Sequence, residues 1–228
     1  MASVDDVMAP LASFSLTHDP SDIFSHLSAF LALVPHALIV AYSTLIIATR
    51  EAEVVLMLAG QLSCEAANFV LKRIIKEERP NELFGKGYGM PSSHAQFMAF
   101  WSVTVLLFLG VRHASPHSAP RSVPLLERVL AGTGAVALAA GVAVSRVYLG
   151  YHTPKQVLAG VAAGVVCAFG WFGVTAVARS SGLVAWGLEL PPARWLRVRD
   201  LLNEEEPAAA GWDKWEEMRA AQQGKKRQ

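Results

Sequence analysis

Charged residues are scarce in this sequence. Only 17% of its 228 residues are Asp, Glu, Lys or Arg, whereas 53% are hydrophobic, and soluble domains carry about 25% charged residues. This composition excludes an ordinary soluble domain and points to a membrane protein. The net charge of +1 sums an acidic amino end and a basic carboxyl end, so only the distribution of charge is informative, and we expect no nucleic-acid partner.

Cysteine frameworks and metal-binding motifs are also missing. Cys64 and Cys167 lie in apolar stretches without C-x-x-C spacing, which predicts buried thiols. No H-E-x-x-H motif or aspartate cluster is present, so no metal and no other cofactor is predicted. A cleaved signal peptide is not expected, because the amino end lacks a positive n-region and carries Asp5, Asp6, Asp19 and Asp22.

Long apolar runs are what the sequence has instead. Four of them, 29–49, 95–111, 129–144 and 156–178, approach the roughly 20 residues that cross about 30 Å of hydrocarbon. A fifth run, 54–71, is interrupted by Gln61, Glu65 and Asn68, which should face a protein interior because polar groups are costly against lipid. We therefore predict an all-α fold, a polytopic membrane bundle of about five transmembrane helices.

The basic residues predict how the chain is oriented. Five spans place the amino tail 1–28 and the loops 72–94 and 145–155 on one side of the domain 29–178, with the tail 179–228 on the other. The side of the carboxyl tail holds 13 of the 20 Lys and Arg residues. By the positive-inside rule the tail is cytoplasmic and both polar loops are lumenal or external.

The carboxyl tail carries signals of its own. Tryptophans and arginines among leucines in 183–202 predict a helix on the membrane surface, and the chain beyond Glu204 is expected to be disordered. The last four residues resemble a dilysine retrieval signal of the endoplasmic reticulum, which acts on a cytosolic tail; a solvated basic end is the alternative. These residues are Lys225, Lys226, Arg227 and Gln228.

Three polar clusters lie at the mouths of apolar runs, all on one predicted side. The first is Lys72 and Arg79, followed by Pro80, in K-R-I-I-K-E-E-R-P. A spacing of seven puts both cations on one face if the second helix extends that far. A snorkelling basic helix end is the alternative.

The second cluster follows a glycine-rich stretch and consists of Pro91, Ser92, Ser93 and His94. Proline with adjacent serines is typical of a helix amino terminus. Free backbone N–H groups there favour an anion, with His94 pointing at it. Capping serines beside a surface histidine are the alternative.

The third cluster is S-R-V-Y-L-G-Y-H, with Ser145, Arg146 and His152. A buried arginine beyond an apolar helix needs an anionic partner, and phosphate suits its planar fork. The T-P-K-Q run that follows predicts a capping box between Thr153 and Gln156. The capping box does not account for Arg146 or His152.

Together the clusters bring three cations, two histidines and a helix amino terminus to one membrane face. Phosphoryl transfer needs such a set, because cations must hold the equatorial oxygens while one group attacks and another handles the proton of the leaving oxygen. A phosphohydrolase acting on a lipid in the same bilayer is the function that this pattern favours.

The three motifs resemble the signatures of the type 2 phosphatidic acid phosphatase superfamily over roughly residues 30–178. Lys72 to Pro80 is similar to K-x6-R-P, and Ser145 to His152 is similar to S-R-x5-H. The run P-S-S-H is similar to P-S-G-H, with Ser93 in place of glycine. Gln156 stands where most relatives have an aspartate that orients the nucleophilic histidine.

The two departures, Ser93 and Gln156, resemble the dolichyldiphosphatase branch of that superfamily. This resemblance implies that a polyprenyl (dolichyl) diphosphate is hydrolysed to the monophosphate at the lumenal face of the endoplasmic reticulum membrane, which would recycle the lipid carrier of protein N-glycosylation. The alternatives are a phosphatase for phosphatidate or a sphingoid-base phosphate, and a non-catalytic membrane scaffold.

The resemblance also implies residue roles without a metal. His152 attacks phosphorus and forms a phosphohistidine, His94 protonates the leaving oxygen and then activates water, and Gln156 orients His152. Because Gln156 lacks the charge of an aspartate, we expect a weaker nucleophile that suffices for a diphosphate. The phosphate-binding set is Lys72, Arg79, Ser92, Ser93 and Arg146.

Several residues are assigned to structure. Gly160 and Gly164 form a G-x-x-x-G pattern that we expect to pack within the bundle before any dimer. His36, beside Pro35, is expected to be a helix-packing residue. The remaining histidines are predicted to lie in loops: His18, His26, His113 and His117.

Overall fold

Five helical segments are long and apolar enough to cross a membrane in the computed structural model, which describes residues 9–11, 16–18, 21–80, 87–112, 124–201 and 207–225. They are Ile23–Thr49, Ala52–Ile75, Ser93–Arg112, Leu125–Tyr148 and Pro154–Ser180. The predicted all-α polytopic bundle is confirmed, including the span that polar residues interrupt.

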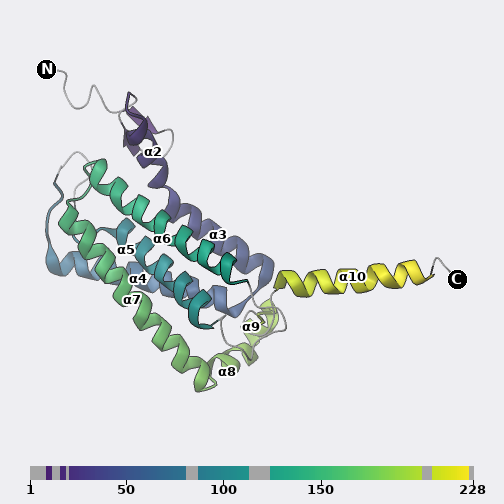
Figure 1. Ribbon diagram of the computed structural model, residues 1–228. Coiled ribbons are helices and arrows are strands. Elements are labelled where there is room, and N and C mark those ends of the chain that lie inside the picture. The colour runs from purple at the N-terminus through teal and green to yellow at the C-terminus, as the bar shows by residue number, and fades with distance from the viewer. Residues whose placement is uncertain are drawn as a thin grey trace.

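The elements follow one another around the bundle as labelled in Figure 1. Strands β1 (Ala9–Leu11) and β2 (Leu16–His18) pair in an antiparallel manner before the bundle. The helices are α2 (Ile23–Leu31), α3 (Val34–Thr49), α4 (Ala52–Ile75), α5 (Ser93–Leu107) with the π-helix η3 (Phe108–Arg112), α6 (Leu125–Tyr148), α7 (Pro154–Ser180), α8 (Leu183–Glu189), α9 (Pro191–Leu196) and α10 (Pro207–Lys225).

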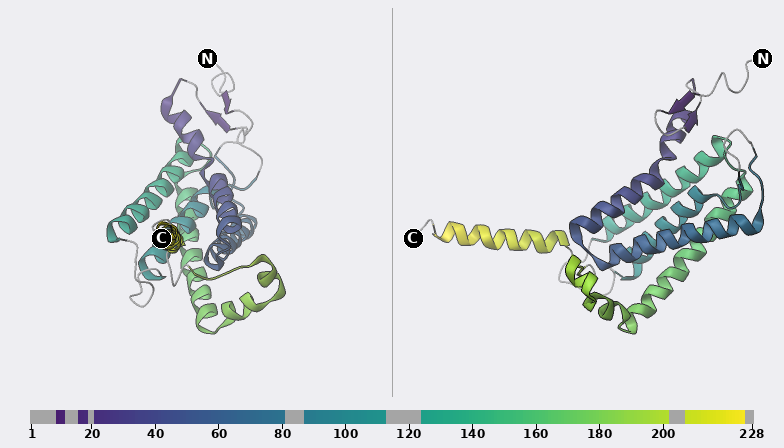
Figure 2. Two further views of the ribbon diagram at one scale, coloured as in Figure 1. Left: turned by 90° about the vertical axis from the view of Figure 1, so that its right-hand side faces the viewer. Right: turned by 180° about the vertical axis from the view of Figure 1, so that it is seen from behind.

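Helix α5 lies at the centre and packs against α4, α6 and α7, as the two further views show (Figure 2). Phe100 on α5 is fully buried against Cys64 of α4 and Ala168 of α7. On its other side, Phe97 and Met98 pack against Val142 of α6. Because apolar side chains cover α5 on several sides, it is the helix on which the others are assembled.

Of the three polar residues predicted to face the interior, Gln61 and Asn68 are buried and donate to α5, whereas Glu65 is half-buried; Oε1 of Gln61 and Oε1 of Glu65 have no partner among the described residues. Gln61 is fully buried and donates to the carbonyl of Phe97 at 3.3 Å. Asn68 donates to Gln96 Oε1 at 2.8 Å, and Gln96 donates to the carbonyl of Cys64 at 2.9 Å. In hydrocarbon an unpaired amide costs several kcal/mol, so these bonds link α4 to α5.

Two glycines allow α7 to approach α5 closely. A Cβ atom on Gly160 would lie 2.5 Å from the carbonyl oxygen of Ser92, and one on Gly164 would lie 2.4 Å from that of Gln96. Only glycine fits against a backbone oxygen at that distance. This confirms that the G-x-x-x-G pattern packs within the bundle.

The tail differs from its prediction in two ways. The surface segment forms two short helices, α8 and α9, because Pro191 and Pro192 start a new helix where a continuous one would need backbone donors. Beyond Glu204, where we expected disorder, the alanine-rich α10 projects away from the bundle (Figure 1), since alanine has the highest helix propensity.

The remaining predictions concern histidines, cysteines and the carboxyl end of the chain. His26 lies on α2 and not in a loop, because Asp22 caps a helix that starts before the predicted span. Cys64 is buried and Cys167 is half-buried, and neither is in a disulfide. His113, His117, Lys226, Arg227 and Gln228, with the side chains of His18 and Lys225, lie outside the described residues.

The glycine contact yields a test of the fold. Gly164→Val should destabilise the protein by about 1–3 kcal/mol, because backbone of α5 would have to move away. Thermal unfolding in detergent measures this. The matched control is Gly173→Ala on the same helix, where an added methyl group meets no atom within 4 Å; equal effects of the two substitutions would contradict the close packing.

Candidate active site

The first predicted cluster lies where α4 ends, but it is not a continuous helix face. Lys72 is in the last turn of α4, and Lys76 then adopts a left-handed conformation with φ of 53°. The chain leaves the helix there, so Arg79 is not seven residues along the same helix as expected. The loop nevertheless returns Arg79 to within electrostatic range of Lys72.

The second cluster forms the amino terminus of α5, as predicted. Ser92 is the N-cap residue, α5 begins at Ser93, and Pro91 follows a cis peptide bond just before the cap. The backbone N–H of Ser92 donates to the carbonyl of Gln156 at 3.1 Å, so this N–H is not available to bind an anion. The hydroxyl of Ser92 is buried, and no hydrogen-bond partner for it occurs among the described residues.

Arg146 lies in the last turn of α6 and is only 2% exposed. Its Nε donates to the hydroxyl of Ser145 at 3.4 Å, and the guanidinium carbon lies 4.9 Å from the ring centre of Tyr151. Within the described part of the chain, nothing accepts a hydrogen bond from its Nη2. A buried cation with an unmatched donor is suited to an anionic ligand.

His152 sits in the short turn between α6 and α7 and is 5% exposed. Its backbone N–H donates to the carbonyl of Arg146 at 3.2 Å. Its ring Nδ1 lies 3.2 Å from Oε1 of Gln156, which also takes part in the predicted capping box with Thr153. One glutamine therefore caps α7 and contacts the imidazole.

The surroundings of His152 favour its neutral form. Burial lowers its pKa from 6.5 to about 4, against the opposing hydrogen bond to Gln156, and the positive charges of Arg79, Lys72 and Arg146 act in the same direction as burial. A neutral imidazole beside three cations can attack an electrophile that those cations bind. The cations are therefore close enough to act together with this ring.

His94 lies on the first turn of α5. Its Nε2 is 3.2 Å from the carbonyl of Ala32, which can only accept, so this nitrogen carries the proton of that bond. Arg146 and His152 are within electrostatic range of its ring. The structure thus brings the three predicted clusters together.

A hollow of about 370 Å³ opens beside His94, and two of its lining residues outside the three motifs are titratable. His36, predicted only to pack, lies with its ring centre 6.3 Å from that of His94. Glu65 lines the same hollow. Their sequence signals, an apolar helix with a histidine or a carboxylate, do not by themselves indicate proximity to the site.

Among the described residues no group of three or more His, Cys, Asp and Glu side chains could hold a metal ion.

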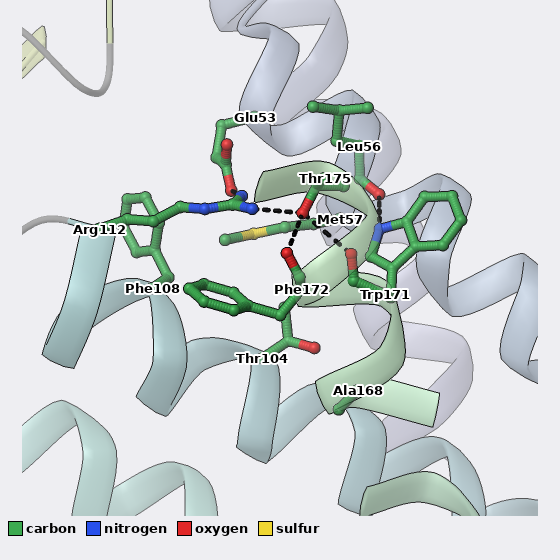
Figure 3. A pocket seen from close by; sticks show the side chains of 10 residues that line it. All are labelled: Glu53, Leu56, Met57, Thr104, Phe108, Arg112, Ala168, Trp171, Phe172 and Thr175. Atoms are coloured by element: carbon green, nitrogen blue, oxygen red, sulfur yellow. Dashed lines mark hydrogen bonds and ion pairs between the residues drawn. The ribbon is translucent and has the colours of Figure 1, made fainter. Parts of the chain in front are cut away.

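A second polar cluster lies at the opposite end of the bundle, and Figure 3 shows part of it, with Arg112 beside Glu53 and Thr175. Glu53 on α4 is 1% exposed and pairs with Arg112 of η3 and, at 2.6 Å, with Arg179 of α7. Arg179 also binds Asp200 of the tail at 2.5 Å. Its carboxylates match its cations, so this cluster anchors the tail and is not a comparable anion site.

With this geometry in place, comparison with known proteins defines the class. The model of the PAP2 superfamily matches residues 53–179, and the chain belongs to this superfamily of membrane phosphatases. A solved structure, the PAP2-type phosphatidylglycerolphosphate phosphatase of Bacillus subtilis, has the same fold with a TM-score of 0.53 and 23% identity. The aligned residues cover 66% of this chain and 75% of the Bacillus subtilis chain.

Within the superfamily, three similar curated proteins are named as dolichyldiphosphatases. "Putative dolichyldiphosphatase" of Neurospora crassa is 48% identical over 95% of this chain and 95% of its own. Dolichyldiphosphatase 1 of Homo sapiens is 41% identical over 72% of this chain and 70% of its own. The dolichyldiphosphatase of Saccharomyces cerevisiae is 32% identical, with 85% and 82% covered.

The electrostatics of His152 can be measured directly. Because its pKa is lowered to about 4, its imidazole should stay neutral as the pH falls from 7 to about 5 and gain a proton only near 4, where a free histidine would already be charged below about 6.5. NMR titration of ¹⁵N-labelled histidines in detergent follows this. Arg79→Gln should move the pKa upward, whereas Arg73→Gln, at an exposed cation against Phe69, should not.

Proposed function

We propose that this phosphatase hydrolyses dolichyl diphosphate to dolichyl phosphate and inorganic phosphate. Its curated relatives bear the name of that activity. The observation that carries the proposal is the buried guanidinium of Arg146, whose unmatched Nη2 lies in a cluster with His152 and His94. Such a cluster of donors suits the terminal phosphate of a substrate.

The proposed chemistry proceeds in two steps. The Nε2 lone pair of His152 attacks the terminal phosphorus while the bond to the bridging oxygen breaks, and His94 protonates that oxygen on the leaving dolichyl phosphate. A water molecule, deprotonated by His94, then cleaves the phosphohistidine and releases phosphate.

Phosphate binding in this proposal relies on fixed positive charges and not on a metal. Lys72, Arg79 and Arg146 lie within electrostatic range of His152. They would hold the equatorial oxygens as the transition state forms. The hydroxyls of Ser92 and Ser93 would add donors at the amino terminus of α5.

An apolar groove beside the site supports a lipid substrate. It has a volume of about 540 Å³, is lined by α5, α6 and α7, and reaches Pro154 and Val157 at the start of α7. His152 precedes that start by two residues. An isoprenoid chain has the apolar surface that such a groove would bury.

We also propose the orientation that the basic residues predict. The amino tail 1–28 and the site would face the lumen of the endoplasmic reticulum, with domain 29–178 in the membrane and tail 179–228 in the cytosol, which agrees with the 13 basic residues on the side of the tail. The product would then re-enter the lipid-carrier cycle of N-glycosylation.

The orientation can be tested with sealed microsomes. Protease added to the outside should remove the carboxyl tail, because the tail would face the cytosol. A tail that is protected from the protease would contradict this orientation.

The central experiment measures phosphate release from dolichyl diphosphate by detergent-purified protein in chelator. Activity should persist in chelator, and His152→Ala should reduce it by ~1000-fold or more because the nucleophile is lost. His26→Ala, at an exposed histidine of α2, is the matched control. A strict magnesium requirement would refute the mechanism, and a preference for phosphatidate would move the substrate to a lipid phosphomonoester.

The same assay tests the role of Gln156 in substrate choice. An aspartate there would stabilise the imidazolium that forms as His152 attacks, so Gln156→Asp should raise activity on simple phosphomonoesters relative to the diphosphate. The ratio of kcat/KM for the two substrates measures this. An unchanged ratio would show that Gln156 does not determine which substrate is preferred.

A further inference from the structure

The amide of Gln156 makes hydrogen bonds at both ends, and those at its nitrogen lead to a further residue. Its Nε2 donates to Oε1 of Glu77 at 3.2 Å and to the carbonyl of Glu78 at 2.8 Å. A carboxylate and a backbone carbonyl can only accept. The NH₂ end of the amide must therefore face the loop after α4.

The oxygen end of the same amide faces His152. Oε1 accepts from the backbone N–H of Thr153 at 3.3 Å and lies 3.2 Å from Nδ1 of His152. Since an amide oxygen cannot donate, Nδ1 carries the proton. The lone pair is then on Nε2, the nitrogen that attacks in the proposed mechanism.

This arrangement depends on which way the amide points. A flipped amide would present NH₂ to Nδ1 and stabilise the other tautomer, in which Nε2 is protonated and cannot attack. The carbonyl of Glu78 and the N–H of Thr153 each favour the observed orientation. The Glu77 carboxylate adds a charge-assisted bond, roughly twice as strong as a neutral one.

Glu77 is held in place for this contact. Its other oxygen, Oε2, accepts from Lys155 Nζ at 2.9 Å, and the bonds from Lys155 and Gln156 lower the pKa of its carboxyl group, so it is ionised at neutral pH. Its backbone carbonyl accepts from the N–H of Gly89 at 2.7 Å. A Cβ on Gly89 would lie 2.8 Å from the Gln156 amide, so a side chain there would displace that amide.

We propose that Glu77 is a positioning residue that fixes the amide of Gln156, and through it the reactive tautomer of His152. The chain Glu77–Gln156–His152 places a carboxylate one residue further from the imidazole than a directly bonded aspartate would be. This inference rests on the proposed role of His152 as nucleophile.

The first test compares neighbouring carboxylates. Glu77→Gln should lower kcat by about 10- to 100-fold, the usual effect of a group that orients another ligand, with little change in KM because Glu77 does not touch substrate. Glu78→Gln is the matched control, since its side chain is exposed and the carbonyl that it offers is retained. Equal kcat values for the two variants would overturn the proposal.

The second test asks whether the effect of Glu77 changes sign. In a Gln156→Asp background the new aspartate accepts directly from Nδ1, and Glu77 becomes a nearby like charge that disfavours it. Glu77→Gln should therefore raise kcat in that background, although it lowers kcat in the wild type. A merely structural contact predicts a loss in both backgrounds, which would overturn the proposal.

A third measurement is independent of the lipid substrate. Orthovanadate can bond to an attacking nitrogen as phosphorus does, so its Kd, measured by calorimetry, should rise about tenfold or more in Glu77→Gln and stay unchanged in Glu78→Gln. Unchanged binding in Glu77→Gln would overturn the role of Glu77 alone. If the wild type or His152→Ala shows that vanadate does not engage His152, the proposed nucleophile fails together with this inference.

Discussion

The close contact of α7 with α5 is the constraint on which the site depends. Gly160 and Gly164 bring the two backbones together, and the carbonyl of Gln156 then accepts the N–H of Ser92 at 3.1 Å. His94 is two residues after Ser92, and His152 is four residues before Gln156. The separation of the two histidines is therefore set by backbone packing and not by flexible side chains.

The two ends of the bundle differ in how a buried charge is paired. The end where Glu53 lies anchors the tail, whereas the end where Arg146 lies is the candidate active site. At one end Glu53 pairs with Arg112 and Arg179, and Arg179 also pairs with Asp200, so two carboxylates balance two guanidinium groups, although Nε of Arg179 has no acceptor among the described residues. At the other end Arg146 is as deeply buried, and neither a carboxylate nor any other acceptor among the described residues meets its Nη2. Burial makes an unmatched donor costly, which is why an anionic phosphate would be bound strongly there.

The sequence predicted much of the fold but misjudged how helices end. The apolar runs located all five spans, because hydropathy follows directly from composition. The predicted runs were shorter than the helices, and a shared face for Lys72 and Arg79 required α4 to continue to Arg79. The left-handed residue Lys76 ends that helix, and nothing in its side chain signals this conformation. The tail likewise forms α10 where we expected disorder.

From the sequence alone came the membrane class, the number of spans, the order of the three motifs and the capping box of α7, since each is a local property of composition or spacing. Only the tertiary structure decided which groups meet. Glu77 contacts Gln156 across 79 positions of the chain, and the burial of His152 beside Arg79 and Lys72 lowers its pKa. Such contacts follow from how helices pack against one another, which no short stretch of residues contains.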